Sequence, residues 1–290
     1  FSGKSILVTS NYVSSYNNSD ITETIINGSA LATVVTFNSG EGNGSVLQGF
    51  TITNGNSQQG GGIFCDNSNP SLSNLIISEN RANESGGGIY CQEAFPTCRE
   101  VQITGNTAEE LGGGIHLFGN SSIDLTNVTI CGNTTEHSGG GIYVCDNSTA
   151  IIKNAIIRGN SQSEIALGRG ERNFVTISYS DIEGGLNNID FEDGDVEWSD
   201  GNIDDDPLFE DAVFTGDDNN YENSVTYPFT AGQHLDAGNV RVYQEDGDND
   251  IYVEITMADG WTLLQSHVDW GLTYDDIPQN NNGIMVPGQF

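Results

Sequence analysis

Basic residues are scarce in this 290-residue sequence: eight Lys and Arg stand against 41 Asp and Glu, which gives a formal net charge of −33. Proteins that bind nucleic acid need clustered Lys and Arg to displace phosphate counterions, so the composition excludes that class. No apolar run approaches the roughly 18–20 residues that a membrane-spanning helix requires. Helix-forming residues are also few, whereas Gly accounts for 37 positions, which argues against a helical protein.

Cysteine is infrequent as well. The five Cys, at positions 65, 91, 98, 131 and 145, do not have the spacing of a zinc site. They fit an oxidising compartment in which at least one thiol stays unpaired. The sequence opens at Phe1 with no initiator Met and no signal peptide, so we interpret it as a processed or excised segment. Together these features predict an extracellular protein.

The sequence contains an internal repeat, which is the first feature to seek in a chain of this composition. The string G-G-G-I occurs four times, and its Ile residues are 26, 26 and 27 positions apart. An Asn precedes the first glycine of each string by six residues, and a fifth Asn continues the series. The four Ile are Ile63, Ile89, Ile115 and Ile142, and the Asn series is Asn54, Asn80, Asn106, Asn133 and Asn160. A second series keeps the same register and consists of Asn74, Asn127 and Asn154, with Glu100 standing in once.

Each period predicts short strands separated by turns. Segments such as residues 101–103 alternate apolar and polar residues, as half-buried strands do. The Asn suits a turn, and the glycines permit conformations closed to other residues. Stacked periods form a parallel β-solenoid, in which equivalent residues lie roughly 4.8 Å apart.

This arrangement predicts ladders of equivalent side chains. The four Ile form one interior ladder, and the Asn series forms a ladder of side-chain hydrogen bonds. A second interior ladder consists of Cys65, Cys91, Leu117 and Val144. The column Phe64, Tyr90, His116 and Tyr143 is predicted to lie on the opposite face, towards solvent. There an aromatic column either stacks on itself or packs against sugar rings.

Three interpretations of the cysteines remain open. Cys65 and Cys91 lie one coil apart, near the separation that a disulfide requires. Cys91 and Cys98 are a local alternative, and a column of buried free thiols is the third. Sequons at Asn27, Asn120 and Asn147 predict glycosylation on turns.

The G-G-G-I-Y/F string with I-x-x-N upstream resembles the right-handed parallel β-helix repeats of secreted bacterial and archaeal surface proteins. Residues 177–185 and 201–209 resemble the last coils of that group. Its members share a pectate-lyase-like shape, and many have no assigned activity. The resemblance implies an all-β fold with a right-handed parallel β-helix over residues 1–215.

Beyond this region the repeat stops. Alternating runs at 240–243 and 251–255, with turn signals at 246–250 and 259–260, predict antiparallel strands. The segment 216–290, which ends in Pro-Gly-Gln-Phe, resembles a small accessory β-sandwich module of secreted proteins. That resemblance implies a capping or attachment role without catalysis. We therefore predict two domains, 1–215 and 216–290.

The stretch 181–222 holds 16 Asp or Glu and no Lys or Arg. Such carboxylates repel one another unless cations or solvent screen them, and calcium favours clustered oxygen ligands. The run 246–250 begins like an EF-hand loop but lacks its later Gly and Glu. The candidate calcium ligands are Asp190, Glu192, Asp193, Asp195, Asp204, Asp205, Asp206, Asp246, Asp248 and Asp250. A solvated acidic surface or a plain hairpin turn is the alternative.

Catalysis finds little support. A polysaccharide lyase needs a base and cations beside its substrate, yet the eight basic residues are not clustered with an acidic ladder. A hydrolase needs converging carboxylates, and the repeat acids Asp66, Glu93 and Asp146 fall where turns are expected. We predict no catalytic residue.

The sequence therefore predicts a non-catalytic structural or adhesive surface protein. Its predicted partners are copies of itself, assembled head-to-tail into a filament or sheath, or cell-surface glycans. The alternative is a carbohydrate-active enzyme, a polysaccharide lyase or glycoside hydrolase, or a glycan-binding β-helix.

Overall fold

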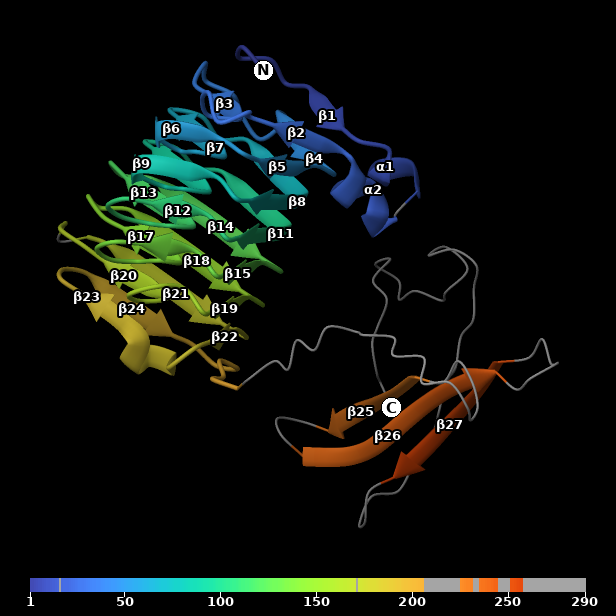
Figure 1. Ribbon diagram of the computed structural model, residues 1–290. Coiled ribbons are helices and arrows are strands. Elements are labelled where there is room, and N and C mark those ends of the chain that lie inside the picture. The colour runs from blue at the N-terminus through green and yellow to red at the C-terminus, as the bar shows by residue number, and fades with distance from the viewer. Residues whose placement is uncertain (16, 171, 206–224, 232–234, 245–250, 258–290) are drawn as a thin grey trace. The chain divides into compact units, whose positions relative to one another are not determined.

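The computed structural model describes residues 1–15, 17–170 and 172–205, and the backbone of three further strands within 225–257. The chain divides into two compact units, Phe1–Leu208 and Phe209–Phe290, and each is described by itself. The first unit is a parallel β-solenoid, whose coils follow one another as stacked layers in Figure 1.

Three parallel sheets run along the solenoid. The first sheet has 13 strands: β1 (Leu7–Thr9), β2 (Ile25–Asn27), β4 (Val46–Gln48), β5 (Thr51–Thr53), β8 (Ser71–Ser78), β11 (Thr97–Thr104), β14 (Ser122–Thr126), β15 (Thr129–Cys131), β18 (Thr149–Lys153), β19 (Ile156–Arg158), β21 (Phe174–Ser178), β22 (Asp181–Ile182) and β24 (Asp195–Trp198). The second sheet has seven: β3 (Val35–Phe37), β7 (Ile63–Asp66), β10 (Ile89–Gln92), β13 (Ile115–Phe118), β17 (Ile142–Val144), β20 (Ile165–Leu167) and β23 (Ile189–Phe191). The third sheet has four: β6 (Asn56–Gln59), β9 (Arg81–Ser85), β12 (Thr107–Ala108) and β16 (Thr134–Thr135).

The two predicted interior ladders are confirmed in the second sheet. The four Ile pair in register from strand to strand, and the Cys65, Cys91, Leu117 and Val144 positions pair in the same way. Every one of these eight side chains is fully buried. The ladders continue beyond the G-G-G-I strings, since Ile142 pairs with Ile165 and Val144 with Leu167. Burial of these continuous apolar columns is the main force that holds the coils together.

The cysteines are free thiols in this structure. Cys65 and Cys91 are directly paired in the ladder, and both belong, with Cys98, to the apolar core. Of the three interpretations of the sequence, the structure therefore contains the column of buried thiols.

The Asn ladder is confirmed from Asn80 to Asn160. The side-chain amides of Asn80, Asn106 and Asn133 each donate to the Oδ1 of the next Asn, at 3.0, 3.0 and 2.9 Å. Each also donates to a main-chain carbonyl, as Asn106 does to the Ile77 oxygen at 2.8 Å. The first three are almost completely buried, so the ladder satisfies polar groups inside the coil.

Asn54 is not part of this ladder, contrary to the prediction from spacing. It is exposed, with a positive φ of 55°, and the ladder position belongs to Gly55, whose N–H donates to Asn80 Oδ1 at 2.9 Å. The pairing of β6 with β9 shifts between Ser57 and Gln59. This irregularity displaces the Asn by one residue while the glycines stay in register.

The three glycines of each string have two different roles. Only the first has a positive φ, for example 69° at Gly86. The second lies against the next coil, because a Cβ on Gly87 would come within 2.5 Å of the carbonyl oxygens of Gly113 and Thr107. The strings therefore set the close stacking of the coils as well as the turn.

Short helices interrupt the all-β pattern. Helices α1 (Tyr12–Ser15) and α2 (Asn18–Glu23) lie between β1 and β2 in the first coil, and η1 (Gly185–Asn188) precedes β23. In α2, Asn17 caps the N-terminus by accepting the Ser19 N–H at 3.0 Å, and Ile21 is buried.

In the second unit the structure describes an antiparallel sheet of β25 (Val225–Ala231), β26 (Leu235–Gln244) and β27 (Ile251–Met257). The predicted alternating runs 240–243 and 251–255 lie within β26 and β27. The remainder of the predicted β-sandwich, residues 216–224, 232–234, 245–250 and 258–290, lies outside the described residues, so the sandwich stays a prediction.

Candidate functional site

The second sheet carries two columns of outward-pointing side chains, the aromatic column and a neighbouring column that contains Asp66, Gln92 and Phe118. The first is the aromatic column, defined by Phe64, Tyr90, His116 and Tyr143, which pair from strand to strand. It continues through Ala166 to Asp190. Alternation along the strands places the aromatic column opposite the Ile and Cys ladders, as predicted.

The prediction that this column faces solvent is wrong for three of its members. Tyr90, His116 and Tyr143 are 3, 4 and 9% exposed, and only Phe64 is half-buried. The rings pack on one another: the ring centroids of Tyr90 and His116 are 5.1 Å apart and those of His116 and Tyr143 5.2 Å apart, both edge-to-face. Gly86 and its equivalents also lie close to the aromatic Cβ atoms.

A groove of about 600 Å³ lies over the aromatic column. Tyr90, His116 and Tyr143 line it together with Phe118, which is half-buried on the neighbouring column. The polar lining comes from both sides: Glu84 and Glu110 belong to or follow strands of the third sheet, whereas Asp146, Arg169 and Glu192 follow β17, β20 and β23. An aromatic floor between polar rims is typical of small-molecule and carbohydrate sites.

The rims of the groove are acidic. Four carboxylates face one guanidinium. Glu84 accepts hydrogen bonds from the side-chain amides of Gln58 at 2.7 Å and Gln59 at 3.1 Å. Arg169 pairs with Glu192 at 3.5 Å, but both side chains are largely exposed, so this ion pair contributes little stability. The groove therefore favours neutral or cationic ligands over anions.

The floor of the groove stays uncharged near neutral pH. Burial lowers the pKa of His116 to about 3. Burial, with the nearby Asp146 charge, raises the pKa of Cys145 to about 12. Burial, then the neighbouring Cys145 and Glu192, raise the pKa of Tyr143 to about 12. A general acid or base works best with a pKa near the working pH, so these groups suit binding rather than proton transfer.

His116 has one unpartnered ring nitrogen. Its Nε2 lies 3.3 Å from Cys145 Sγ, and Cys145 Sγ donates to the Leu117 oxygen at 3.5 Å. With the thiol hydrogen on that carbonyl, Nε2 carries the imidazole hydrogen and Nδ1 is an acceptor. Nδ1 is buried and has no hydrogen-bond partner within the described residues.

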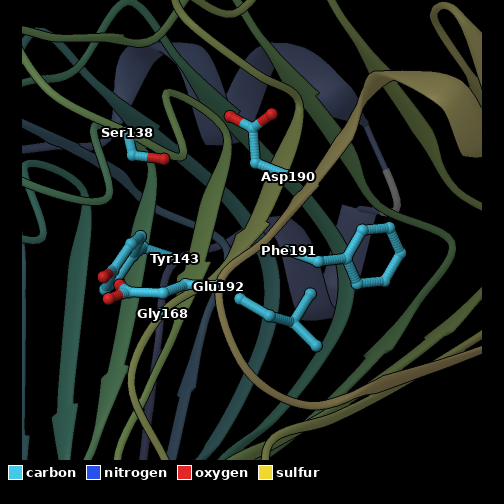
Figure 2. Close-up of a pocket in the computed structure, with 7 residues that line it drawn as sticks. Ser138, Tyr143, Gly168, Asp190, Phe191 and Glu192 are labelled. Atoms are coloured by element: carbon cyan, nitrogen blue, oxygen red, sulfur yellow. The ribbon is translucent and has the colours of Figure 1, made fainter.

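A recess of about 250 Å³ adjoins the groove and shares Tyr143 and Glu192 with it. Asp190, Glu192, Tyr143 and Ser138 line the recess. Figure 2 shows the Glu192 carboxylate beside the Tyr143 hydroxyl and the Asp190 carboxylate pointing away from both. Small residues leave this space open. Ala166 separates Tyr143 from Asp190 in the column, and a side chain at Gly168 would overlap the Tyr143 hydroxyl.

The candidate calcium ligands are dispersed in this structure. Asp190 and Glu192 line the recess, Asp193 accepts a hydrogen bond through its main-chain oxygen from Asn173, and Asp195 begins β24. Asp204 pairs with Arg158 at 3.3 Å, and the Asp205 N–H donates to Asp181 Oδ1 at 3.2 Å. Asp206, Asp246, Asp248 and Asp250 lie outside the described residues.

Over the ranges that the structure describes, no three His, Cys, Asp or Glu side chains form a group that could hold a metal ion. Calcium binding therefore stays a prediction. Of the repeat acids Asp66, Glu93 and Asp146, only Asp146 lines the groove.

Comparison with known proteins bears on the fold. Residues 73–202 match the family model described as "Right handed beta helix region". No curated protein and no solved structure matches the chain. The match and the stacked parallel sheets identify a right-handed parallel β-helix repeat protein. Within the described residues, no helix has both the length and the apolar character that crossing a membrane demands.

The sequence analysis identified the aromatic column but missed the groove. Glu84 and Glu110 are equivalent residues 26 positions apart, so this part of the rim was visible in the repeat. Arg169 carries no such signal, because its neighbour one coil away, Asp146, differs in chemistry. The alternation of β10 and β13 does place Gln92 and Phe118 beside the column, and that signal was available in the sequence.

Proposed function

We propose that this β-helix protein is a non-catalytic extracellular adhesive protein that binds a glycan in the groove over the aromatic column. The observation that carries the proposal is the groove itself. Its half-buried Phe118 ring lies beside the uncharged, almost buried Tyr90, His116 and Tyr143, between rims of hydrogen-bonding side chains. Sugar rings have apolar faces that pack on aromatic rings and hydroxyl edges that bond to polar groups. The floor groups whose pKa values are shifted lie far from neutrality, which favours binding over hydrolysis or elimination.

Phe118 provides the most direct test. Its side chain is half-buried in the groove, so Phe118→Ala removes a sugar-stacking ring with little disturbance of the core. We expect affinity for the glycan that binds best in an oligosaccharide panel to fall roughly three- to tenfold. Phe95→Ala is the matched control, because Phe95 is 52% exposed and does not line the groove.

Calorimetry measures the affinities, and thermal melting verifies that both variants stay folded. The absence of glycan binding to the wild type, or an equal loss in the two variants, would contradict the proposal. Release of reducing ends or unsaturated sugars from a bound glycan would favour the enzymatic alternative.

A second proposal, head-to-tail self-association, is favoured by where exposed apolar side chains lie. Within the described solenoid, most of the large ones occur in the first coil or the last two. They are Ile6, Leu7, Val13, Ile25 and Leu31, then Tyr179, Leu186 and Phe191. Contact between the two ends of neighbouring copies would bury them, and a heterologous contact of this kind gives a filament.

Light scattering tests this second proposal, with Leu7→Glu as the disrupting variant and Ile151→Glu as the control. Ile151 is 45% exposed in the middle of the solenoid. Particles larger than a monomer, reduced by Leu7→Glu alone, are the expected result, whereas a wild-type monomer at high concentration would exclude the filament.

A further inference from the structure

The thiols of Cys65 and Cys91 lie against each other inside the solenoid. The two residues pair directly between β7 and β10, and both side chains are completely buried. Both are free thiols, and a hydrogen bond with Cys65, followed by burial, raises the pKa of the Cys91 thiol. The fold therefore holds two sulfur atoms in contact across adjacent coils.

The other three cysteines are not placed in this way. Among the described strand pairings, Cys98 pairs with two leucines, and Cys131 pairs with a threonine and an arginine. Cys145 follows the last residue of β17. Within the part of the chain that the structure describes, Cys65 and Cys91 are thus the one pair of cysteines that shares a strand register.

The spacing of the two strands suits a covalent bond between these thiols. Neighbouring parallel strands place equivalent Cα atoms roughly 4.8 Å apart, and a disulfide joins residues whose Cα atoms are about 4.4–6.8 Å apart. We propose that Cys65 and Cys91 form a disulfide that joins and stabilises two adjacent coils when the chain folds in the presence of a small-molecule disulfide such as oxidised glutathione. This inference goes beyond the proposed glycan-binding function and does not depend on it.

The reaction is a thiol–disulfide exchange. The thiolate of one cysteine attacks a sulfur of the oxidant, displaces one thiolate and leaves a mixed disulfide on the protein. The thiolate of the second cysteine then attacks the protein sulfur of that mixed disulfide, forms the bond between the two coils and releases the second thiolate. The two cysteines lose two protons and two electrons, and the oxidant is reduced to two thiols.

Burial determines when this bond can form. Neither thiol is exposed in the folded protein, so an oxidant cannot reach either sulfur, and the raised pKa of Cys91 leaves little thiolate to react. The exchange therefore takes place before β7 and β10 are enclosed, or after they have separated. Reduced protein that has already folded should resist an oxidant that links the folding chain.

Metal binding is the other chemistry that neighbouring thiols support. The surroundings of this pair are apolar, since both cysteines belong, with Cys98, to a core cluster that is otherwise Ile, Leu, Val, Phe and Ala. Nowhere in the described ranges do three His, Cys, Asp or Glu side chains form a group that could hold a metal ion. A bond between the two sulfur atoms needs no further ligand and leaves no charge in the core.

The experiment refolds the full chain from denaturant in oxidised or in reduced glutathione. Digestion and mass spectrometry should identify a peptide pair linked through Cys65 and Cys91 in the oxidised sample only. Reduced protein that receives oxidised glutathione after folding should stay unlinked. Protein produced in the bacterial periplasm, which is an oxidising compartment, gives the same peptide test without refolding.

Thermal melting measures the effect of the bond on stability. The linked wild type should melt roughly 5–10 °C above the reduced wild type, because the bond restrains a loop between two positions that are 26 residues apart. Cys65→Ala and Cys91→Ala should each abolish both the link and this difference. Each variant is compared with itself in the two buffers, so the cavity left by the missing sulfur does not affect the comparison.

Two control variants keep both members of the pair. Cys98→Ala removes a buried thiol of the same core cluster, and Cys131→Ala removes a half-buried thiol outside it. Both should retain the link and the difference in melting temperature. The peptide map of the wild type decides the matter if a variant does not fold.

Three results would overturn the inference. The first is wild-type protein that folds in oxidised glutathione, or in the periplasm, with Cys65 and Cys91 unlinked. The second is a link between Cys91 and Cys98, and the third is a Cys65–Cys91 link that leaves the melting temperature unchanged. None of these results bears on the glycan groove, which Phe118→Ala tests separately.

Discussion

The amide of Asn106 shows how one side chain stabilises three successive coils. Its Nδ2 donates to the Ile77 oxygen in the coil before and to Asn133 Oδ1 in the coil after. Its Oδ1 accepts from both the N–H and the Nδ2 of Asn80. The side chain is completely buried, so no water can replace these partners if the amide is lost.

We expect Asn106→Ala to lower the free energy of unfolding by about 3 kcal/mol or more, because several buried polar groups would lose their partner together. The control is Asn43→Ala, since Asn43 is exposed and its φ is not in the left-handed region; its effect should be within about 0.5 kcal/mol. Denaturant unfolding measures both, and similar small effects would contradict the ladder.

Glu164 ends the ladder with a carboxylate in place of another amide. It accepts from the Asn160 N–H at 3.2 Å and from Asn160 Nδ2 at 2.5 Å, and it is 1% exposed. Burial, which outweighs the bonds from Asn160, raises the pKa of Glu164 to about 7, and the nearby Glu183 adds to this. The folded state therefore binds a proton more tightly than the unfolded chain.

Because folding raises the pKa of Glu164, the difference in stability between the wild type and Glu164→Gln should depend on pH. The protonated form is favoured by the fold, so the contribution is complete below pH 4.5 and is lost as the pH rises from 4.5 towards 7. The loss should reach at most about 3 kcal/mol. Glu164→Gln keeps an acceptor for Asn160 but cannot titrate, so its stability should not fall in this way between pH 4.5 and 7.

The comparison must be made as a difference, because His116 acts in the opposite direction. Its pKa falls to about 3 in the fold, so the wild type also loses stability as the pH drops from 6.5 towards 3. A wild-type minus Glu164→Gln difference that stays constant between pH 4.5 and 7 would show that Glu164 is not buried as described.

At the scale of strands and turns, the sequence predicted what recurs in every coil. Identical residues at the same register, such as the four Ile and the G-G-G strings, place strands and ladders because each coil meets the same neighbours above and below. Helices α1 and α2 were missed because each is too short for a 3.6-residue pattern, although Asn17 and Asp20 form a capping signal.

The burial of the aromatic column was missed for a different reason. Alternation assigns a side chain to the outer face of a strand but does not reveal that the rings of adjacent coils pack edge-to-face and cover one another. The groove likewise depends on Arg169 and Glu192, which are not repeated from coil to coil, so only the folded structure brings them beside the aromatic column.

The glycine strings allow steric stacking to be separated from backbone conformation. Gly87→Ala should destabilise by more than about 2 kcal/mol, because its Cβ would collide with two carbonyl oxygens of the next coil. Gly105→Ala meets no atom within 4 Å but has φ of +64°, so it should cost about 1 kcal/mol from conformation alone. Gly42→Ala has neither problem and should be neutral or stabilising. If thermal melts show that Gly105→Ala destabilises the protein more than Gly87→Ala, close stacking of the coils is not the reason why the second position of each string is glycine.

For the whole molecule, the net charge of −33 is the dominant electrostatic fact. Self-repulsion of this size destabilises a compact fold unless ions screen it. Arg158 offsets part of this repulsion, since its guanidinium contacts both Asp181 at 2.9 Å and Asp204 at 3.3 Å. The stretch 181–205 holds ten Asp and Glu and no Lys or Arg.

We therefore expect calcium to raise the melting temperature by several degrees more than sodium chloride at equal ionic strength, with EDTA reversing the difference. A specific ion site gives this excess, whereas general screening gives equal shifts. Identical melts in calcium and sodium would refute a calcium-stabilised fold.

The in-register repeat also allows the length of the solenoid to change in fixed steps. Because Gly87 and Gly113, or Asn106 and Asn133, make the same contacts with their neighbours, a 26-residue unit can be duplicated or removed and the cut ends will meet surfaces that they already fit. Each such event changes the length of the solenoid by one strand spacing, roughly 4.8 Å. Under the proposed glycan-binding function, the aromatic column would lengthen in the same steps, so the number of coils would set the length of glycan that the column spans.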